Sequence, residues 1–173
     1  ALTEAMGSAG RVRVLMHSIA FGNLKPLAPV PENTLRSDSI NALALKLEME
    51  PERLGSLVND TFTEGALALH GLVEADYSTQ VLEDEDFERT IYAMGSSLVS
   101  WVHDIHQRGF FADDARVLGM TSEGNTMAWR GYAAVSAAKV TLESVCRAIA
   151  LEYAPYGIRA NAVQAGVTNT PAL

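Results

Sequence analysis

The side chains best suited to chemistry in this sequence are Tyr132 and Lys139, which lie seven residues apart in an alanine-rich, apolar segment. In an α-helix seven residues make about two turns, so both side chains would point to one side, about 10 Å apart along the axis. A nearby ammonium favours the tyrosinate form and so strengthens the phenol as a proton donor. The same spacing also suits two polar residues at the rim of a buried helix, and spacing alone leaves both interpretations open.

The histidines and the cysteine offer weaker chemistry. His103 and His106 are three residues apart, but no carboxylate or cysteine pattern completes a metal site with them, and we predict none. His17 follows a predicted strand and is expected to be a hydrogen-bonded neighbour of the site rather than a catalyst. Cys146 is the single cysteine and lies in an apolar segment, which is typical of a small core residue in a reducing compartment.

The composition indicates an acidic globular protein. The chain has 173 residues, with 13 Lys+Arg against 21 Asp+Glu, a net charge of −8 and 48% hydrophobic residues. A net negative charge repels phosphate groups, and the sequence contains no basic patch, so we expect no nucleic-acid partner. No apolar run approaches the ~20 residues of a membrane span, and the first residues do not form a signal peptide. We therefore expect a cytoplasmic protein of one domain, with no membrane partner.

The elements that must position Tyr132 and Lys139 follow from the apolar pattern. Two long helices and three strands alternate along the chain; the strands are expected to be parallel, and the first two of them buried. The alternation predicts an α/β fold with a parallel sheet, in which ligands lie beyond the carboxyl ends of the strands. The predicted strands are 11–20, 116–121 and 158–165, the helices are about 84–108 and 132–153, and the strand-end loops are 17–23, 121–131 and 166–170.

The segment 35–77 interrupts this alternation. Its apolar residues recur at helical spacing, but several glycines break the pattern. We predict two or three short helices there, one of them beginning at Pro51, because proline is favoured in the first turn of a helix.

The order of motifs after Tyr132 is specific. The helix with Tyr132 and Lys139 is followed by YGIRANAV and then by a glycine-containing loop with threonine. This order resembles the short-chain dehydrogenase/reductase family, and HSIAF at the end of the first strand resembles the family's enoyl-acyl-carrier-protein reductase branch. The resemblance covers about residues 10–26 and 84–173. It implies that 1–173 is a partial domain, the later half of a Rossmann-like, doubly wound parallel sheet.

The distance between tyrosine and lysine distinguishes the branches of that family. The larger family has its lysine four residues after the tyrosine, where this sequence has Ser136, whereas Tyr-x6-Lys is the pattern of the enoyl reductase branch. The resemblance therefore implies an enzyme that uses NADH or NADPH to reduce an enoyl thioester of acyl carrier protein or CoA, in fatty acid synthesis. Two alternatives stay open: a reductase of another carbonyl or activated alkene, and a non-catalytic relative.

The resemblance also implies a role for each matching residue. Lys139 would bind the ribose hydroxyls of the nicotinamide cofactor, and Tyr132 would donate a hydrogen bond to the thioester oxygen as an enolate forms. Ser122 stands where the branch usually has a second tyrosine, and it keeps a hydroxyl at that position. The other residues expected to line the cofactor are Ser18, Ile19, Ala20, Thr121, Gly166, Thr168 and Thr170.

Two features depart from the family pattern. Residues 35–77 would form a helical insertion, either a surface excursion or a lid or subunit contact over the substrate. The family's glycine-rich phosphate-binding turn is absent from this sequence, so we expect about three strand–helix units of the fold to precede Ala1. The resemblance further implies a homo-oligomer, a tetramer in this family, formed through helices 87–108 and 132–153.

Overall fold

The computed structural model describes residues 4, 6–7, 9–29, 34–73 and 80–166. The chain divides into two compact units, one made of Ala1–Ala28 with Gln80–Leu173 and the other of Pro29–Thr79. The first unit contains the sheet. The bounds of the second are close to those of the segment 35–77, and its status as an insertion within the family fold stays a prediction.

The sheet has three parallel strands, β1 (Val12–His17), β2 (Phe111–Thr121) and β3 (Arg159–Gln164), with β2 in the centre. His17 pairs with Gly119, and Thr121 pairs with Gln164, so the carboxyl ends of all three strands lie at one edge. The prediction of an α/β fold with a parallel sheet is confirmed. The doubly wound, Rossmann-like arrangement stays a prediction, because both long helices of the described residues lie on one face of the sheet. The central strand begins earlier than predicted, because its first residues, Phe111–Asp114, carry two aspartates that the apolar pattern did not include.

The two long helices are present near their predicted bounds. The first is made of α4 (Asp84–Ile91), the π-helical segment η2 (Tyr92–Ser96) and α5 (Ser97–Gln107), and the second is α6 (Ala133–Glu152). Three acidic residues in the first turn of α4 complement the helix dipole. The π-helical turn was not predicted. It lies against α6, where a Cβ atom on Gly95 would come within 2.7 Å of the carbonyl oxygen of Ala138.

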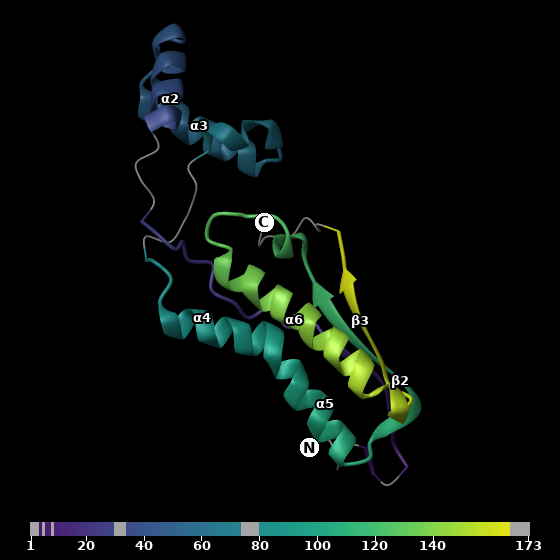
Figure 1. The fold of residues 1–173 in the computed structure, drawn as a ribbon. Coiled ribbons are helices and arrows are strands. Elements are labelled where there is room, and N and C mark those ends of the chain that lie inside the picture. The colour runs from purple at the N-terminus through teal and green to yellow at the C-terminus, as the bar shows by residue number, and fades with distance from the viewer. Residues whose placement is uncertain (1–3, 5, 8, 30–33, 74–79, 167–173) are drawn as a thin grey trace. The chain divides into compact units, whose positions relative to one another are not determined.

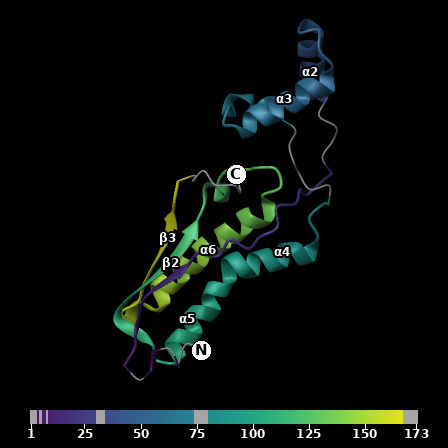
Figure 2. The same cartoon turned by 180° about the vertical axis from the view of Figure 1, so that it is seen from behind.

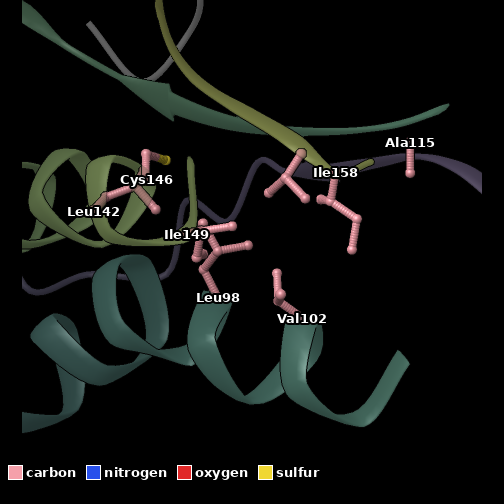
Figure 3. Close-up of a cluster of buried hydrophobic side chains, with 8 residues drawn as sticks. Leu98, Val102, Ala115, Leu142, Cys146, Ile149 and Ile158 are labelled. Atoms are coloured by element: carbon pink, nitrogen blue, oxygen red, sulfur yellow. The ribbon is translucent and has the colours of Figure 1, made fainter. Parts of the chain in front are cut away.

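The main core lies between one face of the sheet and the helices α5 and α6. Figure 3 shows Leu98 and Val102 of α5 pointing toward Ile149 and Ile158. Every side chain of this cluster is almost completely buried. Its members are Leu98, Val102, Ala115, Val117, Leu142, Cys146, Ile149 and Ile158.

The prediction that the first strand is buried is wrong for one face of the sheet. Val14 and Met16 on β1 are 53% and 57% exposed. The reason is that α5 and α6 cover the same face (Figures 1 and 2), so alternate side chains of β1 point away from them. In β3 the four consecutive residues from Asn161 to Gln164 are exposed, so within the described residues this part of the edge strand is open on both faces.

The second unit is helical in its described residues, with α2 (Thr34–Lys46), α3 (Pro51–Thr63) and the 3₁₀ helix η1 (Leu67–Leu72). The predicted helix start at Pro51 is confirmed. This unit has its own small apolar core of Ile40, Ala44, Leu54 and Val58. Among the helices of the described segments, none combines the length and the apolar character needed to cross a bilayer.

Candidate active site

The candidate site lies where β2 ends and α6 begins, at the carboxyl edge of the sheet. A short turn with the 3₁₀ helix η3 (Glu123–Asn125) joins the two elements. Tyr132 is the residue immediately before α6 rather than part of the helix, and its phenol oxygen lies 3.4 Å from the hydroxyl oxygen of Ser122. The turn therefore brings together the two hydroxyl groups that the sequence placed ten residues apart.

Lys139 reaches the same edge of the sheet from the second turn of α6. Its side chain is only 7% exposed, and its ammonium donates a 2.8 Å hydrogen bond to the carbonyl oxygen of Met120. Burial lowers the pKa of Lys139. An ammonium carries three donors, so this geometry leaves donors for ligand hydroxyls. Tyr132 thus contacts Ser122, the residue just after β2, and Lys139 contacts Met120, near the end of β2.

The ring of Tyr132 is held by its neighbours. Trp129 packs edge-on against it, with ring centroids 5.2 Å apart and an interplanar angle of 72°. The backbone of Gly124 lies so close to the tyrosine ring that a Cβ atom there would collide with it. Tyr132 also packs against the buried cluster of Met94, Val135 and Ala138. The phenol is therefore directed by packing on several sides, which favours a fixed position for a hydrogen-bond donor.

His17 closes the site from the end of β1. It is 4% exposed, and its Nε2 lies 2.9 Å from the Ser97 hydroxyl, which itself donates to the carbonyl oxygen of Ala93. This network assigns the proton of the neutral ring to Nε2. Nδ1 is buried and has no hydrogen-bond partner within the described residues. Burial lowers the pKa of His17, and the nearby ammonium of Lys139 lowers it further.

The residues that were predicted to line the cofactor differ in their surroundings: some are exposed and others contact protein side chains. Ser18 and Ala20 are exposed after β1, whereas Ile19 packs against the cluster of Met94, Val135 and Ala138. Thr121 donates its hydroxyl proton to Glu143 across 2.6 Å. Gly166 is exposed. The roles of these residues stay predictions, and Thr168 and Thr170 lie outside the described residues.

Sequence reasoning missed three residues that hold the turn. Ser136 of α6 donates to the carbonyl oxygen of Gly124, and Glu143 of α6 accepts from the side chain of Asn125. The signal was available, because the helix positions 132, 136, 139 and 143 differ by four, three and four, which places them on one face.

Of the two histidines on α5, His106 packs against aromatic rings and His103 is exposed. The ring of His106 contacts Tyr153 and Tyr156 edge-on, with centroids 5.1 and 4.5 Å away. In the part of the chain that the structure describes, no group of three or more His, Cys, Asp or Glu side chains could hold a metal ion.

Comparison with known proteins agrees with this arrangement. Residues 36–173, most of the chain, match the sequence profile of the family described as Enoyl-(Acyl carrier protein) reductase. The chain belongs to this family. The family resemblance that the sequence indicated is thereby confirmed. The match includes Tyr132 and Lys139, begins after the HSIAF segment, and also runs through residues 36–77, which the sequence analysis had left outside the resemblance.

Two further similarities cover smaller parts. A 1-cyclohexenylcarbonyl-CoA reductase from Streptomyces collinus is 38% identical over 58 residues, which are 34% of this chain and 21% of that protein. The match thus spans about a fifth of the relative's length. A crystal structure of FabI from Alistipes finegoldii is similar over 49% of this chain and 32% of its own, with a TM-score of 0.46 and 19% identity.

Proposed function

We propose that the protein containing this chain is an oxidoreductase that reduces the 2,3 double bond of an enoyl thioester with NADH or NADPH. The observation that carries the proposal is the convergence of the Tyr132 phenol and the Lys139 ammonium on the end of β2. Membership of the enoyl reductase family supports the same activity. The name of the Streptomyces relative specifies a CoA thioester, which supports the thioester class.

Tyr132 acts at the carbonyl oxygen of the substrate. When the double bond accepts a hydride at its β-carbon, negative charge develops on the thioester oxygen. A phenol donor aimed at that oxygen stabilises the charge where it forms. Ser122 supports this donor, because its hydroxyl is within hydrogen-bond reach of the phenol and fixes the direction of the phenol proton.

Lys139 binds the cofactor. The described residues fit a nicotinamide nucleotide at this point, since a buried ammonium with donors to spare suits the hydroxyls of a ribose. A bound reduced nicotinamide supplies the hydride. Lys139 would orient the nicotinamide from the carboxyl edge of the sheet, where Ser18 and Ala20 after β1 are exposed.

The position four residues after the tyrosine argues for a double bond rather than a ketone. In the larger family that position supplies the lysine, whereas here Ser136 uses its hydroxyl to bind Gly124 of the turn. The lysine therefore approaches from one helical turn farther along α6. A reductase of another carbonyl or activated alkene is the alternative that a substrate panel separates.

The expected partners follow from the same family. We propose a thioester of acyl carrier protein or CoA as substrate, a cytoplasmic place in fatty acid synthesis, and a homotetramer.

Exposed apolar side chains on the helices support self-association, namely Tyr92, Val99, Trp101 and Val140. In light scattering, Trp101→Glu should lower the mass of the assembly, and an unchanged mass would contradict this interface.

The test is oxidation of NADH or NADPH by the complete protein, read at the nicotinamide absorbance. The substrate panel contains crotonyl-CoA, 1-cyclohexenylcarbonyl-CoA and a ketone such as acetoacetyl-CoA. We expect turnover of the enoyl thioesters and loss of rate in Tyr132→Phe, with Tyr156→Phe, an exposed tyrosine beyond the other end of α6, as the matched control. Turnover of acetoacetyl-CoA alone, or of none of the three compounds, would overturn the proposal.

A further inference from the structure

One face of α6 holds the turn that follows β2. Tyr132, just before the helix, and three side chains of this face, at positions 136, 139 and 143, each make a polar contact with residues 120–125. Tyr132 and Lys139 have proposed roles in the reaction, and Ser136 binds backbone. Glu143 is the remaining member, and it contacts neither of the two catalytic candidates directly.

Glu143 joins the two ends of the turn through a single oxygen atom. Its Oε1 accepts a 2.6 Å hydrogen bond from the hydroxyl of Thr121, the last residue of β2. The same Oε1 accepts a hydrogen bond from the side-chain amide of Asn125, the last residue of η3. Ser122 lies between these two anchored residues, so the carboxylate fixes the backbone on both sides of it.

Asn125 depends on this contact. Its Oδ1 atom is buried and has no hydrogen-bond partner within the described residues. Its amide nitrogen is therefore the group that pairs, and the partner is Glu143. Without the carboxylate, the amide nitrogen of Asn125 would also lose this hydrogen bond, beside an Oδ1 atom that already has none within the described residues.

We propose that Glu143 is a positioning residue, which clamps the turn between Thr121 and Asn125 so that the Ser122 hydroxyl stays within reach of the Tyr132 phenol. The effect of Glu143 on the reaction rate rests on the proposed function. The effect of Glu143 on the structure of the turn does not depend on that function.

The clamp works through hydrogen bonds rather than through charge. Both groups that donate to Glu143, the Thr121 hydroxyl and the Asn125 amide, are neutral. A neutral side chain of the same shape that keeps Oε1 as an acceptor should therefore replace Glu143. Glutamine meets this description, and alanine does not.

The kinetic test uses the complete protein with crotonyl-CoA and reduced nicotinamide, after correction for the folded fraction. We expect Glu143→Ala to lower kcat by about tenfold, as a misplaced donor does, with KM for crotonyl-CoA changed by less than about threefold. Glu143→Gln should stay within about threefold of wild type in kcat. Glu152→Ala, which removes an exposed carboxylate from the last turn of the same helix, is the matched control and should change neither parameter.

A double variant separates positioning from general loss of structure. If Glu143 acts through Ser122, then Glu143→Ala combined with Ser122→Ala should be no slower than the slower single variant by more than about twofold. Rate losses that multiply in the double variant would overturn the proposal. A Glu143→Gln variant as slow as Glu143→Ala would overturn it as well.

Amide hydrogen exchange gives a readout that needs no turnover. We expect exchange in residues 121–131 to be at least about tenfold faster in Glu143→Ala than in wild type and close to wild type in Glu143→Gln, with α5 unchanged. If the wild-type protein reduces no thioester, the proposed function fails, and the exchange result still decides whether Glu143 fixes the turn. Unchanged exchange in Glu143→Ala would overturn the inference.

Discussion

The hydroxyl oxygen of Ser122 lies 3.4 Å from the phenol oxygen of Tyr132, across the turn that joins β2 to α6. The enoyl reductase branch usually has a second tyrosine at the position of Ser122. A serine is shorter, yet its hydroxyl oxygen still lies within reach of the phenol in this turn. The two hydroxyl groups lie within hydrogen-bond reach of each other, and we propose that Tyr132 faces the substrate while Ser122 orients its phenol.

This relationship predicts that removing each hydroxyl lowers kcat by a different factor. Tyr132→Phe should lower kcat for crotonyl-CoA by about 10²–10³-fold, because it removes a donor to the developing oxyanion. Ser122→Ala should lower kcat by roughly 3- to 10-fold, since it removes one neutral hydrogen bond to the donor. Steady-state kinetics of both variants checks the order. A Ser122→Ala variant as slow as Tyr132→Phe would show that the serine, rather than the tyrosine, faces the substrate.

Lys139 should control cofactor affinity. Lys139→Met keeps an unbranched side chain of similar length but removes the ammonium that is proposed to bind the ribose. Hydrogen bonds to charged groups contribute about 1.5–3 kcal/mol, so the Kd of reduced nicotinamide should rise by roughly 10- to 100-fold. Fluorescence titration of NADH and NADPH measures it. Lys46→Met, at the exposed end of α2, is the control, and an unchanged Kd in Lys139→Met would contradict the cofactor role.

His17 should make stability depend on pH. Because its pKa is lowered in the folded protein, below pH about 6.5 the unfolded chain binds a proton that the folded chain excludes. Stability is therefore lost as pH falls below that value, by up to about 1.4 kcal/mol per pH unit, and is retained above it. Urea denaturation at pH 5.5 and 7.5 should show a smaller difference in His17→Gln than in wild type. The exposed His103→Gln is the control, and equal differences in all three proteins would refute this assignment.

Gly119 sets the distance between α6 and the sheet. A Cβ atom at this position would lie 2.7 Å from the sulfur of Cys146 and 3.1 Å from Cγ of Leu142, both in the main core. Gly119→Ala should lower the free energy of unfolding by about 1–3 kcal/mol, as overpacking does. Adding Cys146→Ala should restore part of the loss, because it removes the nearest atom.

Urea denaturation of these variants measures the effect, with Gly71→Ala as the control. A Cβ atom at Gly71 would meet nothing within 4 Å, so this variant should stay within about 0.5 kcal/mol of wild type. A Gly119→Ala protein as stable as wild type would mean that the helix can move away from the sheet at no cost.

The elements of the fold were predictable because their signals are local. Branched residues gave β1 within a few residues, the segment 158–165 gave β3, and a run rich in Ala, Val and Leu gave α6. Burial of the strands was not predictable, because it depends on which side of the sheet each helix covers. Val14 and Met16 have the composition of a buried strand, yet they point to the face that α5 and α6 leave open.

Part of the candidate site was predictable in the same way. Tyr132 and Lys139 were found from spacing and resemblance, whereas Glu143 and Asn125 were not, because the contact between them depends on the path of the turn. The assignment of Tyr132 to the helix was wrong by one residue, since α6 begins at Ala133. This shift matters chemically, because a residue ahead of the helix can turn its side chain toward Ser122.

The most direct test of the central claim is the fate of the transferred hydride. The complete protein is supplied with crotonyl-CoA and with reduced nicotinamide that carries deuterium at the transferable position, and the product is analysed by mass spectrometry and NMR. We predict butyryl-CoA with one deuterium at the β-carbon and a solvent proton at the α-carbon. Unchanged crotonyl-CoA, or deuterium at any other carbon, would contradict the proposed enoyl thioester reduction.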